Sequence, residues 1–165
     1  MSERAWIRGA QRGSVADLEL LFREHWPRAF RAARLVTGDA AAAEDIAQEA
    51  FLAAVRNLDR FDRRRPFAPW LHRIVVNRAI DWTRSRRLRA EVELGDYIPA
   101  AAAPELAGSA LGHIGELAPE HRAVVVLRYV LEYTPGEIAE LLDLPRGTVN
   151  SRLRRGLDRM KELEA

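Results

Sequence analysis

Arginines gathered in two parts of the chain are the residues best suited to chemistry, and that chemistry is the binding of a polyanion. Of the 26 basic residues, all but Lys161 are arginine. Residues 60–90 hold ten arginines against two aspartates, and residues 146–161 hold six basic residues against one acidic residue. Guanidinium groups form paired hydrogen bonds to phosphates and to guanine edges. The segregation therefore predicts two contact surfaces for one nucleic acid, the alternative being solvated surface charge.

The second arginine-rich segment lies in a pattern typical of a helix-turn-helix. Thr134, Pro135 and Glu137 are suited to start a short helix with a capping box. Residues 144–147 form a turn into a second helix, expected over residues 148–163. Its outward side chains suit the edges of duplex bases and their phosphates. These outward residues are Asn150, Ser151, Arg154 and Arg155. A plain helical hairpin with exposed arginines is the alternative.

The first arginine-rich segment combines a basic loop with aromatic residues. The loop covers residues 61–70 and leads into a helix expected from Pro69 to about Arg87. Steps of three and four place a polar stripe on one side of that helix: Trp70, Arg73, Asn77, Asp81 and Arg84. Such a surface suits unstacked single-stranded bases and their backbone. The alternative is that Trp70 and Trp82 belong to the core.

These segments must be positioned by helices, because helical periodicity dominates and no sustained alternation indicates a sheet. We expect one helix from Ser14 to about Val36, kinked or broken at Pro27, and another from Asp39 to about Leu58. Further helices are expected near residues 108–117, 119–131 and 135–143. Residues 88–107 carry Pro and Gly, and from Glu91 onward only acidic charge, which favours a flexible linker over a packed connector. The fold class is therefore all-α, with two small helical domains.

The second of these helices carries acidic side chains beside an apolar one on its outward side. Asp45, Gln48, Glu49 and Leu52 share this side, and Phe51 and Leu52 cannot both be buried easily. A face of this kind is either a protein-docking surface or a solvated face.

Several classes of function are excluded by composition. The chain has no cysteine, and its four histidines do not have metal-ligand spacing, so we expect no disulfide, metal or other cofactor. It contains no phosphate-binding loop and no convergent acid–base pair, so we expect no enzyme. No apolar run is long enough for a membrane helix, and the N-terminus leads into no hydrophobic signal core. We therefore expect a cytoplasmic protein without membrane insertion.

Together these segments resemble the extracytoplasmic-function (ECF) sigma factors, the two-domain alternative sigma subunits of bacterial RNA polymerase. The resemblance rests on DAAAAEDIAQEAF at residues 39–51, FAPWLHRIVVNRAID at 67–81, LAPEHR at 117–122 and YTPGEIAELLDLPRGTV at 133–149. It covers about residues 14–87 and 111–163. It implies a factor that binds core polymerase, recognises the −35 and −10 promoter elements and melts the −10 region.

The resemblance also implies a division of the chain and a set of site residues. Residues 1–87 would form sigma region 2, residues 88–107 a flexible acidic linker, and residues 108–165 sigma region 4, with no sensory extension after it. The −10 element would be contacted by Arg63, Arg64, Arg65, Phe67, Trp70, Arg73, Asn77, Arg84, Arg86 and Arg87. The −35 element would be contacted by Arg128, Arg146, Thr148, Asn150, Ser151, Arg154 and Arg155. Core polymerase would be contacted by Asp45, Gln48, Glu49 and Leu52.

The implied partners are promoter DNA, the clamp helices of the largest polymerase subunit and the flap of the second-largest subunit. An anti-sigma factor is a further partner that the family admits. One departure concerns the loop, where Arg64, Arg65 and Pro66 replace the Gly- and Ser-rich residues common in the family. The rival within nucleic-acid binding is a regulator with one helix-turn-helix, which would not need the basic aromatic loop. Charge alone further suggests that the acidic linker holds the two basic units together in the free protein.

Overall fold

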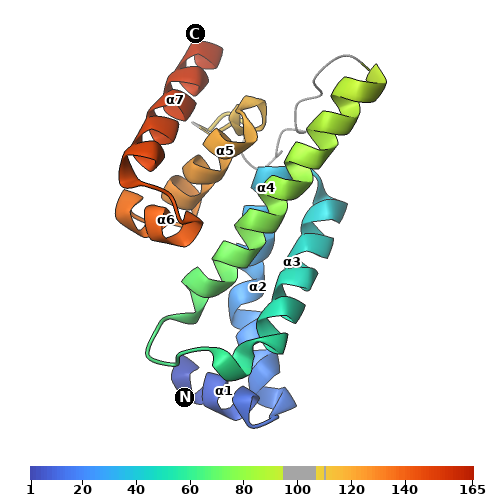
Figure 1. The fold of residues 1–165 in the computed structure, drawn as a ribbon, viewed down its shortest axis with the longest axis vertical. Coiled ribbons are helices and arrows are strands. Elements are labelled where there is room, and N and C mark those ends of the chain that lie inside the picture. Colours follow the sequence, from blue (N-terminus) through green and yellow to red (C-terminus); the bar gives the residue numbers. More distant parts are fainter. Residues whose placement is uncertain (95–106, 110) are drawn as a thin grey trace.

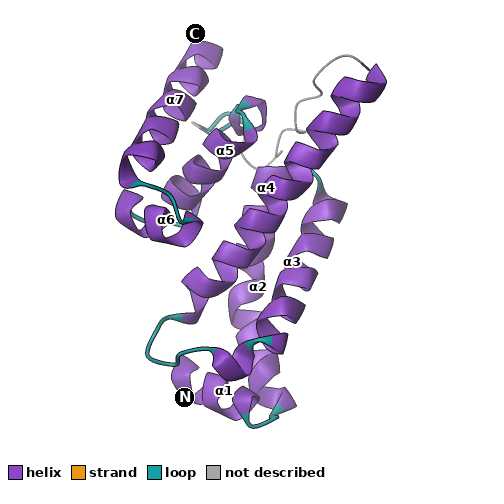
Figure 2. Ribbon diagram, in the orientation of Figure 1, coloured by secondary structure: helices purple, strands orange, loops and turns teal. Residues whose placement is uncertain are grey.

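The computed structural model describes residues 1–94, 107–109 and 111–165, and these residues contain helices and loops but no strand (Figures 1 and 2). The expected all-α fold class is confirmed. The elements are α1 (Glu3–Gln11), α2 (Val15–Thr37), α3 (Ala40–Arg56), η1 (Leu58–Arg60), α4 (Phe67–Leu94), η3 (Ile114–Glu116), α5 (Pro119–Val125), η4 (Val126–Val130, a π-helical segment), α6 (Pro135–Leu142) and α7 (Arg146–Glu164).

The N-terminal unit consists of α1 to α4, with α2, α3 and α4 as three long helices that pack against one another (Figure 1). Alanines fill much of their shared core, including Ala32, Ala33 and Ala50, which are fully buried. Small side chains let the helix backbones approach closely. Gly38, at φ 71°, ends α2 in the left-handed conformation, and the Asp39 carboxylate caps α3 by accepting from the Ala42 amide at 2.9 Å.

Four helix boundaries differ from the sequence expectation. α1 was not predicted, although Ser2 caps it and Ile7 buries its apolar side. α2 runs through Pro27 without a break, because Pro27 lies on the exposed side, where water can bind the carbonyl that it leaves unpaired. α4 continues to Leu94, so residues 88–94 are helix rather than flexible linker. The helix expected over residues 108–117 is wrong: turns and the short η3 replace it, in a segment rich in glycine.

The C-terminal unit consists of η3, α5, η4, α6 and α7. Thr134 and Glu137 form the predicted capping box at the start of α6. α7 packs its buried residues, including Val149 and Leu153, against α5 and α6. It comes close to α5 at Gly156, where an added Cβ would lie 3.0 Å from Cγ2 of Val125. The second helix of the predicted helix-turn-helix is therefore fixed in position by close packing.

The two units also pack against each other. α4 contacts α5 and α6, and α2 contacts η3, α5 and η4, so the C-terminal unit lies along one side of α4 (Figure 1). We call this surface the interdomain contact. Its polar groups come from parts of the chain that are distant in sequence, and it was not predicted in this form.

Candidate nucleic-acid interface

The outward side of α7 presents polar and cationic side chains near its N-terminal end. Arg146, Asn150, Arg154 and Arg155 are exposed, whereas Thr148 and Ser151 are partly buried. Val149 and Leu153 alternate with them and face the core. The capped α6, the left-handed Asp143 (φ 54°) and the immediate start of α7 at Arg146 set the angle at which this side is presented. The predicted helix-turn-helix is confirmed, with α7 starting two residues earlier than expected.

Three exposed arginines on this side of α7 form no ion pair within the described part of the chain. Among the described residues, no carboxylate pairs with Arg146, Arg154 or Arg155. Sequence reasoning did not single out Arg152. This residue lines a surface hollow together with Ser151 and Arg155, and Glu120 and His121 of α5 line the same hollow. Burial lowers the pKa of His121. Glu120 raises this pKa and the nearby Arg155 and Arg152 lower it, so that the net shift is downward.

Arg128 lies apart from the other expected −35 residues. It is partly buried after α5, where its guanidinium covers the Tyr129 ring at 5.6 Å and Nη1 donates to the Tyr133 carbonyl at 3.4 Å. These contacts orient the side chain at the edge of the C-terminal unit.

α4 carries the predicted polar stripe on its outer side. Arg73, Asn77, Asp81 and Arg84 are exposed, and Leu71, Val75 and Ala79 are buried on the opposite side. Trp82 is partly buried and covered by the Arg86 guanidinium, 5.4 Å from the ring centre. The prediction that this helix has one polar, exposed side and one apolar, buried side is therefore confirmed.

The loop before α4 exposes its arginines on a short turn. Arg63, Arg64 and Arg65 are all exposed. The Asp62 carboxylate accepts from the Arg64 backbone amide and from its guanidinium, each at 3.0 Å to Oδ1. These hydrogen bonds lower the pKa of Asp62 and shape the turn locally. Arg63 and Arg65 thereby project from an ordered loop.

Phe67 requires a correction. It was expected to contact the −10 element, but it is only 3% exposed and packs edge-on against Phe61 and Trp70, with the His25 ring 4.9 Å away. A buried ring cannot stack on a base, so Phe67 instead anchors the loop to the core. The accessible aromatic is Trp70, which is partly exposed and stacks on Phe61 with ring centres 4.7 Å apart.

Trp70 lies in a cleft of about 1130 Å³ between the two units. One wall of this cleft comes from η1, the loop and α4, and the other from the segment around α6. The first wall contributes three arginines and the second three carboxylates: Arg60, Arg65 and Arg73 against Glu137, Glu140 and Asp143. The cleft therefore joins the expected single-strand surface to an acidic surface of the C-terminal unit.

Three expected phosphate contacts at the far end of α4 already have carboxylate partners. Arg84 pairs with Glu120 of α5 at 2.7 Å, Arg86 with Asp39 at 4.0 Å and Arg87 with Glu91 at 3.4 Å. Burial opposes ionisation of Glu120, but hydrogen bonds from its own backbone amide and from Arg84 hold its pKa below the ordinary value. Glu120 is therefore anionic and competes with phosphate for Arg84.

The outward face of α3 exposes all four residues that were expected to contact core polymerase. Asp45, Gln48, Glu49 and Leu52 are all exposed, Leu52 at 54%. Phe51 is buried instead, which resolves the conflict between these two neighbours. The only ion pair in this group that the structure describes joins Glu49 to Arg78 of α4 at 3.2 Å.

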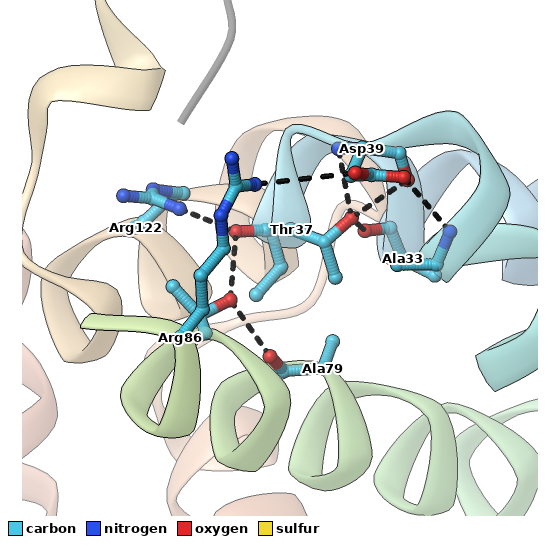
Figure 3. A network of polar contacts seen from close by, with 9 residues as sticks. Ala33, Thr37, Asp39, Ala79, Arg86 and Arg122 are labelled. Carbon is cyan, nitrogen blue, oxygen red and sulfur yellow. Dashed lines mark hydrogen bonds and ion pairs between the residues drawn. The ribbon is translucent and has the colours of Figure 1, made fainter. Parts of the chain in front are cut away.

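Sequence reasoning missed the residues that join the two units. Arg122 is fully buried, and its guanidinium donates to the Val36 carbonyl at the end of α2, and also to the Leu117 and Gly115 carbonyls at 2.8 and 3.1 Å. Figure 3 shows that Arg122 of α5 and Arg86 of α4 both point toward the end of α2. Only the six-residue segment LAPEHR pointed to this arginine, and nothing local indicated a partner so distant in sequence.

The described ranges contain no group of three or more His, Asp or Glu side chains placed to hold a metal ion. Within the same ranges, no helix has the length and apolar character needed to cross a membrane.

Comparison with known proteins matches both units to one family. Residues 21–89 match the family model of sigma-70 region 2, and residues 113–160 match that of sigma-70 region 4. The chain is similar to the ECF RNA polymerase sigma factor SigL of Mycobacterium tuberculosis, with 35% identity over 90% of this chain and 89% of the relative. It is 29% identical to the ECF RNA polymerase sigma factor SigW of Bacillus subtilis, over 94% of this chain and 91% of the relative.

A solved structure shows a similar arrangement of the fold. The chain aligns with CnrH, determined in complex with the cytosolic domain of CnrY, at a TM-score of 0.74 and 29% identity. The alignment covers 98% of this chain and 96% of CnrH.

Proposed function

This chain belongs to the ECF RNA polymerase sigma factors, and from this premise we propose how its two helical units divide promoter recognition. A sigma factor is a subunit of RNA polymerase that directs promoter-specific transcription initiation. The observation that supports the division is that one chain exposes two different surfaces: the cationic side of α7, and the polar stripe of α4 with its arginine-rich loop.

α7 is proposed to read the −35 element as duplex DNA. Its exposed Asn150, Arg154 and Arg155 suit base edges and phosphates, and a helix of this width fits the major groove. Arg146, Thr148 and Ser151 lie at the N-terminal end of α7, where backbone amides add attraction for phosphate. Arg128 would contact a flanking phosphate.

α4 and its loop are proposed to bind the non-template strand of the −10 element. Asn77 and Trp70 would hold an unstacked base by hydrogen bonding and stacking, while Arg63, Arg65 and Arg73 contact the backbone. Capture of unstacked bases stabilises the open duplex without any nucleotide hydrolysis. Arg64, Arg84, Arg86 and Arg87 would exchange their present carboxylate partners for phosphates.

The outward face of α3 is proposed as the docking surface for core polymerase. Its carboxylates, Asp45 and Glu49, lie on the same side of α3 before the exposed Leu52, so that a basic helical partner would gain both charge and apolar contact. The clamp helices of the largest subunit are the partner proposed for this face, and the flap of the second-largest subunit is proposed for the C-terminal unit.

Three coarser features follow from the same premise. Sigma factors are non-enzymatic initiation factors, and we propose that this chain has no catalytic activity or cofactor of its own. Since polymerase acts on the chromosome, we place its function in the cytoplasm. Because CnrH was solved in complex with the cytosolic domain of CnrY, we propose that this chain also has a regulatory protein partner of the anti-sigma type. Its proposed domain division remains residues 1–87, 88–107 and 108–165, with the first seven linker residues helical.

Run-off transcription with purified bacterial core polymerase on a library of promoter fragments tests this function. Adding the chain should produce transcripts from fragments that share two short motifs at a fixed spacing. Absence of factor-dependent transcripts from the whole library would contradict the function.

A further inference from the structure

The short helix α1 lies outside both DNA surfaces and outside the family match of region 2, which begins at residue 21. It packs against α2 and η1, at the end of the N-terminal unit where the chain passes from α3 to α4 (Figure 1). We call residues 61–66 the −10 loop. We propose that α1 positions the −10 loop for base capture, with Gln11 as the positioning residue. The inference rests on the proposed role of this loop and α4 in binding the −10 strand.

Gln11 joins the end of α1 to the start of the −10 loop through two hydrogen bonds. Its Nε2 atom donates to the Leu58 carbonyl at 2.9 Å and to the Phe61 carbonyl at 3.2 Å. A carboxamide nitrogen carries two hydrogens, so it can make both bonds at once. Leu58 is the first residue of η1 and Phe61 follows its last, so one side chain fixes both ends of this short helix.

The position of Phe61 reaches the residue proposed to stack on an unstacked base. The Phe61 ring lies against Trp70 in a stacked arrangement, with ring centres 4.7 Å apart. Trp70 is partly exposed, so one part of its indole meets Phe61 and another part is accessible. A shift of the Phe61 backbone would move the ring that supports Trp70. Gln11 therefore acts on base capture through Phe61 and does not itself need to contact DNA.

The other end of α1 is connected to the other end of the −10 loop. Oε1 of Glu3, in the first turn of α1, lies 2.5 Å from Nε2 of His25 in α2. The buried His25 ring in turn lies 4.9 Å from the ring of Phe67, which is the first residue of α4 after the loop. The two ends of α1 thus support the two ends of the loop, Gln11 at Phe61 and Glu3 through His25 at Phe67.

Between these supports the −10 loop is exposed and has only local hydrogen bonds. Arg63, Arg64, Arg65 and Pro66 are all exposed. The Asp62 carboxylate accepts from the Arg64 amide, and the Asp62 carbonyl accepts from the Arg65 amide, each at 3.0 Å. Because both partners of each bond belong to the loop, these bonds shape the turn but do not place it on the protein. A loop that α1 already holds in place avoids the entropy cost of ordering it during base capture.

α1 is itself fixed to the core, as a positioning element must be. Ile7 is only 1% exposed and packs into the core of the N-terminal unit. Gly9 lets α1 approach the start of α2, because an added Cβ would lie 1.7 Å from Oδ2 of Asp17. Arg8, by contrast, is exposed. Gln11 and Arg8 therefore offer a matched pair of positions on one helix, the first bonded to the loop and the second turned to solvent.

Hydrogen–deuterium exchange of the full chain measures whether Gln11 holds the loop. Gln11→Met keeps a side chain of similar length and removes both donors, and the control Arg8→Met introduces the same side chain at the exposed position. Backbone amides within residues 58–65 should exchange several-fold faster in Gln11→Met than in the parent. Amides in the middle of α2 and α3 should exchange at the parent rate in both variants, and Arg8→Met should leave the loop unchanged.

Base preference measures what this positioning does for the proposed function. Run-off transcription with purified bacterial core polymerase is performed on two promoter libraries, one randomised only in the −10 element and the other only in the −35 element. Gln11→Met should reduce the preference among −10 sequences several-fold and leave the preference among −35 sequences unchanged. A loss of folded protein lowers the yield from both libraries and cannot change one preference alone, so this readout separates positioning from stability.

Three results would overturn the proposal: loop exchange in Gln11→Met at the parent rate, an unchanged −10 preference, or equal effects of Gln11→Met and Arg8→Met. A parent that gives no factor-dependent transcripts from either library would contradict the sigma function instead. The exchange measurement needs neither polymerase nor DNA, so it would still decide whether Gln11 holds the loop.

Discussion

The arginines of α7 and those of α4 differ in their partners, although the two segments look equally basic in sequence. On α7, no carboxylate of the described residues pairs with Arg154 or Arg155. On α4, Arg84, Arg86 and Arg87 are all paired with carboxylates. The exposed α7 arginines can meet a phosphate directly, whereas Arg84, Arg86 and Arg87 of α4 must first exchange their carboxylate partners.

The difference shows that a count of charges does not measure the capacity to bind DNA. An exposed ion pair contributes only about 0–1 kcal/mol, so phosphate can displace each carboxylate on α4 at small cost. The buried hydrogen bonds of the interdomain contact are harder to break.

The largest effect is expected from breaking the interdomain contact at Arg122. Arg122→Met leaves the Val36, Leu117 and Gly115 carbonyls without this donor, and should lower the free energy of unfolding by roughly 3 kcal/mol or more. Chemical denaturation provides the measurement. The control Arg31→Met, at an exposed position of α2, should change the free energy of unfolding by less than about 0.5 kcal/mol. Similar losses in the two variants would contradict the bridging role.

The buried His72 predicts a pH dependence of the same contact. Burial, with the nearby Arg28 and His25, lowers the pKa of His72 to about 4 in the folded chain. Because the unfolded chain binds this proton more readily, the stabilisation is complete above the ordinary pKa of 6.5 and is lost as the pH falls from 6.5 to about 4. The loss should be on the order of 3 kcal/mol.

The corresponding measurement is the free energy of unfolding at several pH values. His72→Leu should flatten the slope of this free energy between pH 6.5 and 4. A parent whose slope is unaffected by His72→Leu would show that this histidine is not buried as described.

Reversing charge on α3 tests whether docking is independent of both DNA surfaces. Asp45→Lys with Glu49→Lys should reduce affinity for core polymerase by roughly tenfold or more, since rim and docking charges govern association. Circular dichroism should remain unchanged because both positions are exposed. Glu162→Lys with Glu164→Lys is the matched control. If the α3 variant binds core polymerase as tightly as the parent, this face is a solvated surface and not a docking surface.

The sequence patterns that predicted structure well were local ones. The capping box at Thr134, the turn before α7 and the two sides of α4 depend on residues three or four positions apart, so they can be recognised without the fold. Phe67 was misassigned because its neighbours in the core, His25 among them, are distant in sequence. The Arg122–Val36 bridge joins residues 86 positions apart, which no periodicity encodes. α1 was missed because its signal was a short one, Ser2 as cap with Trp6 and Ile7 behind it.

The central claim, that α7 and α4 serve different promoter elements, is tested most directly by a reciprocal footprint of holoenzyme on one promoter. Arg154→Ala should weaken protection of the −35 duplex by roughly tenfold, the worth of one good base contact, while thymines of a bound −10 region stay reactive to permanganate. Asn77→Ala should preserve −35 protection and reduce permanganate reactivity at −10 by a similar factor. Parallel loss of both signals in both variants would contradict the division of promoter recognition between the two helices.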